Sequence, residues 1–143
     1  MVLLTAVLFQ FSVILAEKTC GYELKSKVSI LSPIGKKQVF KVGIADTSQT
    51  QQKGLMFCDK LTERSGLLFI FNRDSVHYFW MKNTKIELAI IYIDKNGTIL
   101  SIRKGEPYNE QMLSSVFPVR YVLEINWKES LNIKTGDKVI FGS

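Results

Sequence analysis

The chain consists of short apolar segments separated by clusters of turn residues, and this spacing limits the fold more than any other feature of the sequence. A chain of 143 residues is long enough to bury one hydrophobic core and has the usual size of one domain. No segment has the strand–helix–strand alternation that a parallel sheet requires. About eight strands are expected, at residues 24–31, 36–45, 66–71, 77–82, 86–93, 98–103, 120–126 and 138–141.

These strands indicate a mostly β, single-domain fold, either a β-sandwich or a distorted barrel, with one or two short helices. Residues 66–71 are apolar at every position, which predicts a strand that is buried on both faces. Residues 120–126 instead alternate, so that Glu124 is expected on the polar face of its strand.

One short helix is predicted between the second and third of these strands. Asp46 followed by Gln49 resembles a capping box, which would start a helix over residues 47–53. Gly54 follows at the position where a left-handed helix cap favours glycine. Residues 55–57 are apolar and are expected to return to the core.

The same pattern recurs near the C-terminus, where Asn126 and Glu129 predict a second cap and a short helix from residue 127 to about residue 132. Between residues 105 and 118 the sequence has no periodicity and predicts a long loop. Turns are expected at residues 33–35, 72–76, 94–97 and 135–137.

The N-terminal segment suggests export from the cytoplasm. Residues 1–16 carry no charged side chain, and Glu17 and Lys18 follow directly. The run is shorter than the roughly 20 residues of a membrane-spanning helix, and Ala16 fits a signal-peptide cleavage site. We therefore expect a periplasmic or secreted protein without a stable membrane span after cleavage; retention of the segment as an anchor is the alternative. Residues 17–23 are predicted to be a linker to a domain at 24–143.

The chain has two cysteines, Cys20 and Cys58, and one histidine, His77. An even number of cysteines permits a disulfide in an oxidising compartment. Two unpaired thiols remain the alternative, because Cys20 lies near the mature terminus, where chains are often loose. Since a tetrahedral zinc site takes four ligands, we expect no metal site, and no motif indicates a cofactor.

The net charge of +6 does not indicate a nucleic-acid partner. The basic residues are scattered along the chain as pairs, and no block of five or six of them occurs. A nucleic-acid-binding domain usually gathers its cations on one face or along one helix. We therefore expect no nucleic acid among the partners, and we expect a monomer.

Several motifs follow one another along the chain: Gly-Leu-Met at residues 54–56, Gly-Leu-Leu-Phe-Ile-Phe at 66–71 and, most specific, Phe-Trp-Met-Lys-Asn-Thr at 79–84, which we call the signature segment. In this order, over roughly residues 38–141, they resemble the DUF192 family. The resemblance implies a compact, jelly-roll-like β domain, often behind a bacterial signal peptide, and implies no activity. The family usually carries Arg at the position of Cys58 and Asp at that of Ala89, so a pair of residues could be lost here. The motif residues expected to have structural roles are Asp46, Gly54, Met56, Gly136 and Asp137.

The polar end of the signature segment is the candidate ligand site. If residues 77–82 form a strand, Trp80 and Lys82 share one face, and Asn83 and Thr84 follow at its end. Together with Glu124 they would give an aromatic floor with a cation, an amide and a carboxylate, which suits a small polar ligand such as a sugar or an anion. The alternative is structural: Asn83 and Thr84 form a turn, Lys82 pairs with Glu124 or Glu87, and the aromatic residues are core.

Evidence for catalysis is weaker. His77 could act as a general base, and Cys58 could be a nucleophile if the two lie close together. The sequence has no nucleophile-elbow motif and no phosphate-binding glycine loop. We therefore favour a non-catalytic binding module. The alternatives are a hydrolase or transferase acting on a glycan or phosphorylated compound, and a structural accessory of an envelope protein complex.

Overall fold

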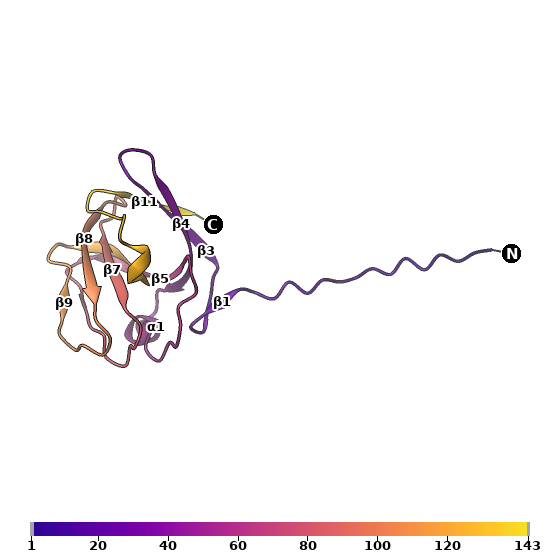
Figure 1. The fold of residues 1–143 in the computed structure, drawn as a ribbon, viewed down its shortest axis with the longest axis horizontal. Coiled ribbons are helices and arrows are strands. Elements are labelled where there is room, and N and C mark those ends of the chain that lie inside the picture. Colours follow the sequence, from indigo (N-terminus) through magenta and orange to yellow (C-terminus); the bar gives the residue numbers. More distant parts are fainter. Residues whose placement is uncertain (1, 143) are drawn as a thin grey trace.

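The fold is taken from a computed structural model, which describes residues 2–142. Its main element is one sheet of seven strands, and seven of the eight predicted strands belong to it (Figure 1). The strand order across the sheet is β11 (Lys138–Gly142), β3 (Ser26–Leu31), β4 (Lys37–Ala45), β5 (Ser65–Ser75), β10 (Val119–Asn126), β7 (Leu88–Ile93) and β8 (Ile99–Gly105).

The sheet curls until its two edge strands, β11 and β8, approach each other. Thr98, just before β8, forms an isolated antiparallel bridge with Lys138. Three further backbone bonds join the same edges, from Val139 N to Gly97 O at 2.7 Å, from Ile99 N to Asp137 O at 3.0 Å and from Gly136 N to Ile99 O at 2.8 Å. The mostly β, single-domain distorted barrel predicted from the sequence is thus confirmed.

One pair of neighbouring strands departs from the expected topology. All neighbours in the sheet are antiparallel except β4 and β5, which run parallel. The connection between them contains helix α1 (Ser48–Lys53), so the absence of any parallel pairing was a wrong prediction. A helix of six residues is too short to give the helical periodicity by which such a crossover is recognised.

Two apolar clusters lie on opposite faces of the curled sheet. Along β7, alternate residues belong to different clusters, and all six are buried. The interior cluster contains Val28, Ile30, Phe40, Val42, Leu68, Ala89, Ile91, Ile93, Ile99, Leu123, Ile125, Ile133 and Val139. The outer cluster contains Ala45, Leu55, Cys58, Leu61, Leu67, Phe69, Met81, Leu88, Ile90, Tyr92, Val119 and Val122.

Helix α1 begins one residue later than predicted. The cap is Thr47 with Thr50, each side chain accepting from the other's backbone N–H, so Asp46 and Gln49 do not cap it. Gly54 ends the helix with φ 50° and ψ −129°, a positive φ as expected but outside the left-handed helical region. Phe57 does not return to the core and is 75% exposed.

Other local predictions also need correction. Residues 17–23 are not a linker, because β1 (Lys18–Thr19) and β2 (Tyr22–Glu23) pair as a ribbon. The expected turn at 72–76 is mostly a continuation of β5. The second helix is only a 3-10 turn, η1 (Trp127–Glu129), and Asn126 does not cap it because its amide donates to Leu61 O at 3.0 Å.

The predicted turns at 94–97 and 135–137 are present. Gly97 and Gly136 have φ of 81° and 90°, values that residues other than glycine rarely adopt. The buried carboxylate of Asp137 accepts from Lys134 N at 2.9 Å and holds the turn before β11.

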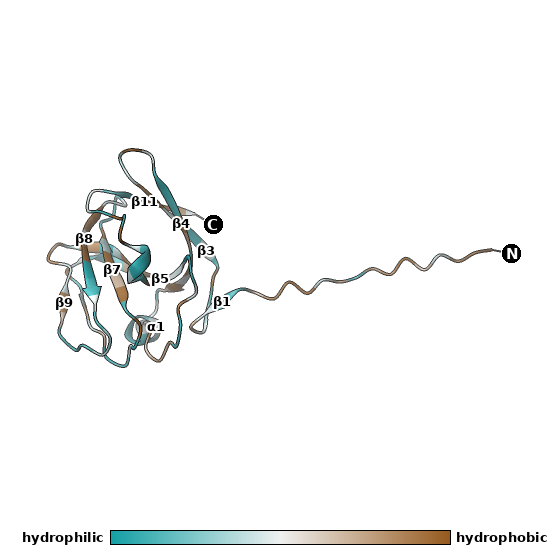
Figure 2. Ribbon diagram, viewed as in Figure 1, coloured by the Kyte–Doolittle hydropathy of each residue, from teal (hydrophilic) through white to brown (hydrophobic). Residues whose placement is uncertain are grey.

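Residues 2–16 extend away from the domain as an exposed, largely hydrophobic segment (Figures 1 and 2). Across residues 2–142, no helix combines the length and the apolar content needed to cross a bilayer.

Candidate functional site

The signature segment is a loop that crosses the outer face of the sheet, and the predicted strand at 77–82 is wrong. Only β6 (Tyr78–Phe79) is extended, and it pairs with β9 (Leu113–Ser114). Met81 is buried beneath the loop, and its N–H donates to Asn109 O at 2.8 Å. Asn83 has φ 52° and forms the tip of a turn that closes with a bond from Thr84 N to Met81 O at 3.1 Å.

The five candidate residues are divided between two neighbouring hollows. Trp80, Thr84 and Glu124 line one cavity of about 220 Å³. Lys82 and Asn83 line an adjacent hollow of about 430 Å³, and Trp80 lies between the two because it lines both.

The alternative structural interpretation holds in part. Thr84 is buried, and its hydroxyl donates to Lys82 O at 2.9 Å, so Asn83 and Thr84 do form a turn. The ammonium of Lys82 lies 5.1 Å from the centroid of the Trp80 ring, and no ion pair to Glu124 or Glu87 occurs in the part of the chain described. Trp80 is not core either, since it is 36% exposed.

Aromatic rings form part of the cavity wall, and its floor is the outer face of the sheet. Phe79 makes T-shaped contacts with Phe69 and Tyr92, with ring centroids 4.9 and 5.9 Å apart. The other side is the end of α1 and the turn after it. The lining residues are Gln51, Gln52, Lys53, Gly54, Leu55, Met56, Phe69, Phe71, His77, Tyr78, Phe79, Trp80, Met81, Thr84, Leu88 and Glu124.

Glu124 is the buried acid on the cavity floor. It points from β10 to the outer face, between Leu67 of β5 and Ile90 of β7 in the register of the sheet. The residue is 4% exposed, and among residues 2–142 its Oε2 has no hydrogen-bond partner. Burial in these apolar surroundings raises the pKa of Glu124 to about 8, so the carboxyl is mostly protonated at neutral pH.

His77 is half-buried, and the sequence suggested it only as a general base, either alone or beside Cys58 as the nucleophile. Its ring stacks on Phe71 with centroids 3.6 Å apart, and Nε2 is buried with no partner among the described residues. Burial lowers the pKa of His77, which favours the neutral imidazole. The backbone is fixed by Ser115, whose Oγ accepts from His77 N at 3.0 Å.

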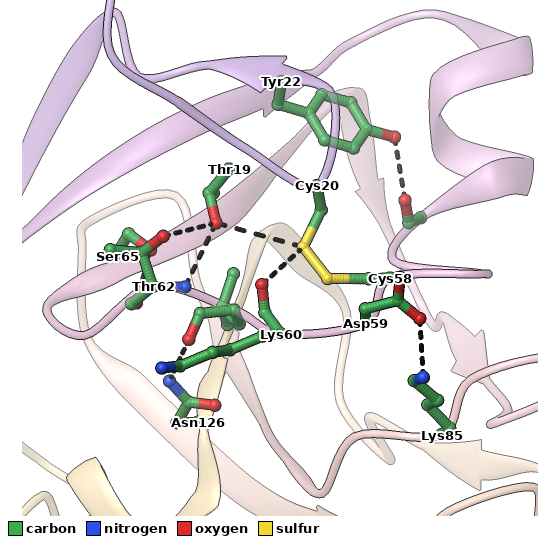
Figure 3. The surroundings of a disulfide bond; sticks show 12 residues. Thr19, Cys20, Tyr22, Cys58, Asp59, Lys60, Thr62, Ser65, Lys85 and Asn126 are labelled. Atoms are coloured by element: carbon green, nitrogen blue, oxygen red, sulfur yellow. Dashed lines mark hydrogen bonds and ion pairs between the residues drawn. A yellow bond between two sulfur atoms is a disulfide. The ribbon is translucent and has the colours of Figure 1, made fainter.

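A disulfide between Cys20 and Cys58 ties the N-terminal ribbon to the loop after α1 (Figure 3). The two Cα atoms are 5.1 Å apart, within the usual range for such a bond. The ribbon thereby places Tyr22 beside the cavity, where its hydroxyl donates to Gly54 O at 2.8 Å. Because both thiols are used, the Cys58–His77 nucleophile pair suggested by the sequence does not exist.

The cavity has cationic side chains only at its rim. Lys53 lies over the Tyr22 ring, with its ammonium 5.4 Å from the centroid. Within the described residues no group of three or more His, Cys, Asp or Glu side chains is placed to hold a metal ion. The site is therefore a hollow partly lined by aromatic rings, with the buried Glu124 at its floor and the buried Nε2 of His77 beside it.

Comparison with known protein families assigns the chain to one of them. The profile of DUF192, described as uncharacterized ACR, matches residues 30–141. The chain belongs to the DUF192 family. No curated protein sequence matches it.

Two solved structures have the same fold. One, a proposed transcription regulator from Sinorhizobium meliloti 1021, is 29% identical, with a TM-score of 0.78 over 81% of this chain and 92% of that one. The other, a protein of unknown function from Novosphingobium aromaticivorans DSM 12444, is 38% identical, with a TM-score of 0.75 over 80% of this chain and 83% of that one.

The two positions that depart from the DUF192 pattern do not form a pair in this structure. Cys58 belongs to the outer cluster and Ala89 to the interior cluster, on opposite faces of the sheet. The disulfide gives Cys58 a separate role, as the anchor of the N-terminal ribbon.

Proposed function

We propose that this DUF192 protein is an exported, non-catalytic binding module that takes a small polar ligand, a sugar in preference to an anion, in the cavity over Glu124. The observation that carries the proposal is the buried carboxyl oxygen of Glu124, which has no partner in residues 2–142 and lies at the bottom of an aromatic-walled cavity.

A buried polar group without a partner costs about 1–3 kcal/mol of folding free energy. An apolar side chain of similar size would fill the space between Leu67 and Ile90 without that cost. Such a cost is common at binding sites, where the ligand completes the hydrogen bonding.

The chemistry of the lining favours a sugar. Rings such as Trp80 and Phe79 can stack on the apolar face of a sugar, while a protonated Glu124 and a neutral His77 can donate to and accept from hydroxyl groups. An anion on the same floor would face the carboxyl and would repel its ionised form. The nearest cation, Lys53, is at the rim.

Export has separate support. The Cys20–Cys58 disulfide fits an oxidising compartment such as the periplasm or the extracellular space. Mass spectrometry of the protein expressed in a bacterial host tests this proposal. A mature chain that begins near Glu17 supports cleavage, whereas a chain that retains residues 1–16 in the cytoplasm contradicts it.

Ligand binding is tested by a thermal-shift screen of monosaccharides, small anions and nucleotides. A ligand at a hundredfold excess over its Kd stabilises the folded state by about 2.7 kcal/mol. We expect sugars to raise Tm and expect Glu124→Leu to abolish the shift, although that variant keeps the packing of the floor. Leu131→Ala, at a side chain that is 65% exposed, is the control. An unchanged shift in Glu124→Leu, or no shift with any sugar, refutes the proposal.

One observation favours a second candidate, a hydrolase or transferase. Glu124 is buried and His77 is half-buried with a buried Nε2, both line the cavity, and the pKa of Glu124 is raised while that of His77 is lowered. Pairs of this kind are typical of general acid–base catalysis. Turnover of a glycan or phosphate ester that is lost in both His77→Gln and Glu124→Gln would favour the enzyme over the binding module.

A further inference from the structure

The cavity over Glu124 adjoins a second hollow, which in turn adjoins a third. At about 220 Å³ it is smaller than the roughly 300–1,000 Å³ of typical small-molecule pockets, so on its own it suits a ligand of about one sugar ring. Beyond Trp80 lies the hollow of about 430 Å³, and beyond Asn83 a third of about 380 Å³. We call the second and third hollows together the outer groove.

The three hollows lie in a row, because neighbouring ones share lining residues. Met56 and Trp80 line both the cavity and the second hollow. Phe57 and Asn83 line both the second and the third, and Tyr108 lines the far end. A chain-like ligand could therefore run from Glu124 past Trp80 and Phe57 to Tyr108.

Two large aromatic side chains stand exposed along the outer groove in an unfavourable backbone conformation. Phe57 has φ 62° and is 75% exposed, and Tyr108 has φ 62° and is 62% exposed. A positive φ is uncommon for non-glycine residues and is a true outlier for bulky ones. Residues held in this way cluster at ligand-binding sites, where the surrounding structure fixes them.

Backbone hydrogen bonds hold both aromatic residues against the signature turn. Phe57 N–H donates to Asn83 O at 2.8 Å, and Tyr108 N–H donates to Thr84 O at 2.9 Å. Three separate loops thus meet at the tip of the signature segment. Because the backbone is fixed before binding, stacking a ligand on these rings would cost little further ordering.

The outer groove is positively charged. Lys53 and Lys82 line the second hollow and lie over the rings of Tyr22 and Trp80 rather than beside a carboxylate. In the third hollow Lys85 is paired with Asp59 (Figure 3), and this pairing lowers the pKa of Asp59. Two cations on the groove therefore remain available to an acidic ligand.

We propose that the outer groove binds an oligosaccharide that carries carboxylate groups, as a continuation of the sugar in the cavity. The sugar rings stack on Trp80, Phe57 and Tyr108, and the carboxylates face Lys53 and Lys82. This inference rests on the proposed function, because the sugar in the cavity is the first unit of the chain.

A sugar polymer fits these observations better than an extended peptide. Flat aromatic faces separated by polar side chains suit stacked rings with hydroxyl rims, whereas peptides are usually recognised by strand addition or by deep apolar pockets. Neither Phe57 nor Tyr108 belongs to a strand whose edge could pair with a peptide. Binding of a peptide is therefore an outcome that would contradict the proposal.

Isothermal titration with oligogalacturonates of increasing length tests the proposal. We expect the Kd to fall at least tenfold from the monomer to the tetramer and to rise again with salt, because the lysine contacts are exposed to solvent. Phe57→Ala and Tyr108→Ala should remove most of the gain with length while leaving monomer binding unchanged. Phe117→Ala, at an exposed aromatic residue that lines none of the three hollows, is the matched control.

The outcomes separate the groove from the cavity. If the monomer binds in a Glu124-dependent way but affinity does not rise with length, the groove proposal fails and the proposed function stands. If the tetramer binds in a Phe57-dependent way and Glu124→Leu has no effect, the groove binds the oligosaccharide by itself, and both the cavity site and the continuation of the ligand from it are refuted. Equal binding of the tetramer by Phe57→Ala and wild type, or tighter binding of neutral cello-oligosaccharides or of extended peptides, overturns the groove proposal.

Discussion

Glu124 makes the stability of this protein depend on pH in an unusual direction. Its pKa rises from an ordinary 4.5 to about 8 on folding, because burial between apolar strands disfavours the charged form. The folded state therefore holds a proton that the unfolded chain has lost. Below about pH 4.5 both states are protonated and stability is highest; it then falls as pH rises and levels off above about pH 8.

The size of the effect follows from the same values. Each pH unit between these two pKa values removes about 1.4 kcal/mol of unfolding free energy, which gives a total of about 5 kcal/mol. Glu124→Gln cannot ionise and should lose this dependence. At pH 7 the unfolded wild type is ionised and the folded one is not, so the variant should be more stable by about 3 kcal/mol.

Urea denaturation of both proteins at intervals from about pH 4 to about pH 9 measures the difference. His77 titrates in the same range with the opposite sign: its lowered pKa gives stability that is lost as pH falls. Since His77 is present in both proteins, the difference between the two curves isolates Glu124. Parallel curves, or a variant that is less stable than wild type at pH 7, would refute the reasoning about Glu124.

Two further changes test the scaffold. Reducing the Cys20–Cys58 disulfide, or replacing both cysteines by serine, frees a loop of 38 residues in the unfolded chain. The unfolding free energy measured by urea denaturation should fall by about 4 kcal/mol. An unfolding free energy that does not change when reductant is added would contradict this. In Gly66→Ala the new Cβ would lie 2.5 Å from the backbone oxygen of Glu124, and the variant should lose about 1–3 kcal/mol of unfolding free energy. The control Gly142→Ala, whose Cβ has its nearest contact at 3.6 Å, should leave the unfolding free energy unchanged. Equal unfolding free energies for the two variants would show that the sheet relaxes around residue 66.

The seven sheet strands could be predicted because their burial follows directly from their side-chain pattern. β7 and the first half of β5 are apolar on both faces, as expected for strands inside a sheet. β10 was expected to alternate with Glu124 on a polar face, but residues 122–125 are all buried, so Glu124 lies on an apolar face of the sheet. The continuation of β5 to Ser75 was missed because its last residues are polar. That part of the strand lies at the end of the sheet, where pairing does not require burial on either face.

The signature segment was misread because a loop can bury apolar side chains without a regular period. Phe79 and Met81 look like alternate residues of a strand, but Met81 is buried because its loop folds across the outer cluster. The sequence grouped Glu124 with Trp80, and both line the cavity. It gave no signal for the stacking of His77 on Phe71, which depends on how β5 and the following turn come together.

The meeting of β11 and β8 bears on how the protein resists self-association. A strand at the end of an open sheet presents free N–H and C=O groups, to which a second chain can add by β-pairing and so begin aggregation. Here backbone groups of Val139 and Asp137 form hydrogen bonds with Gly97 and Ile99, and so occupy part of the edge between β11 and β8. The hairpin of residues 94–97 therefore protects an edge that would otherwise be open to a neighbouring molecule, and loosening it should promote aggregation before global unfolding.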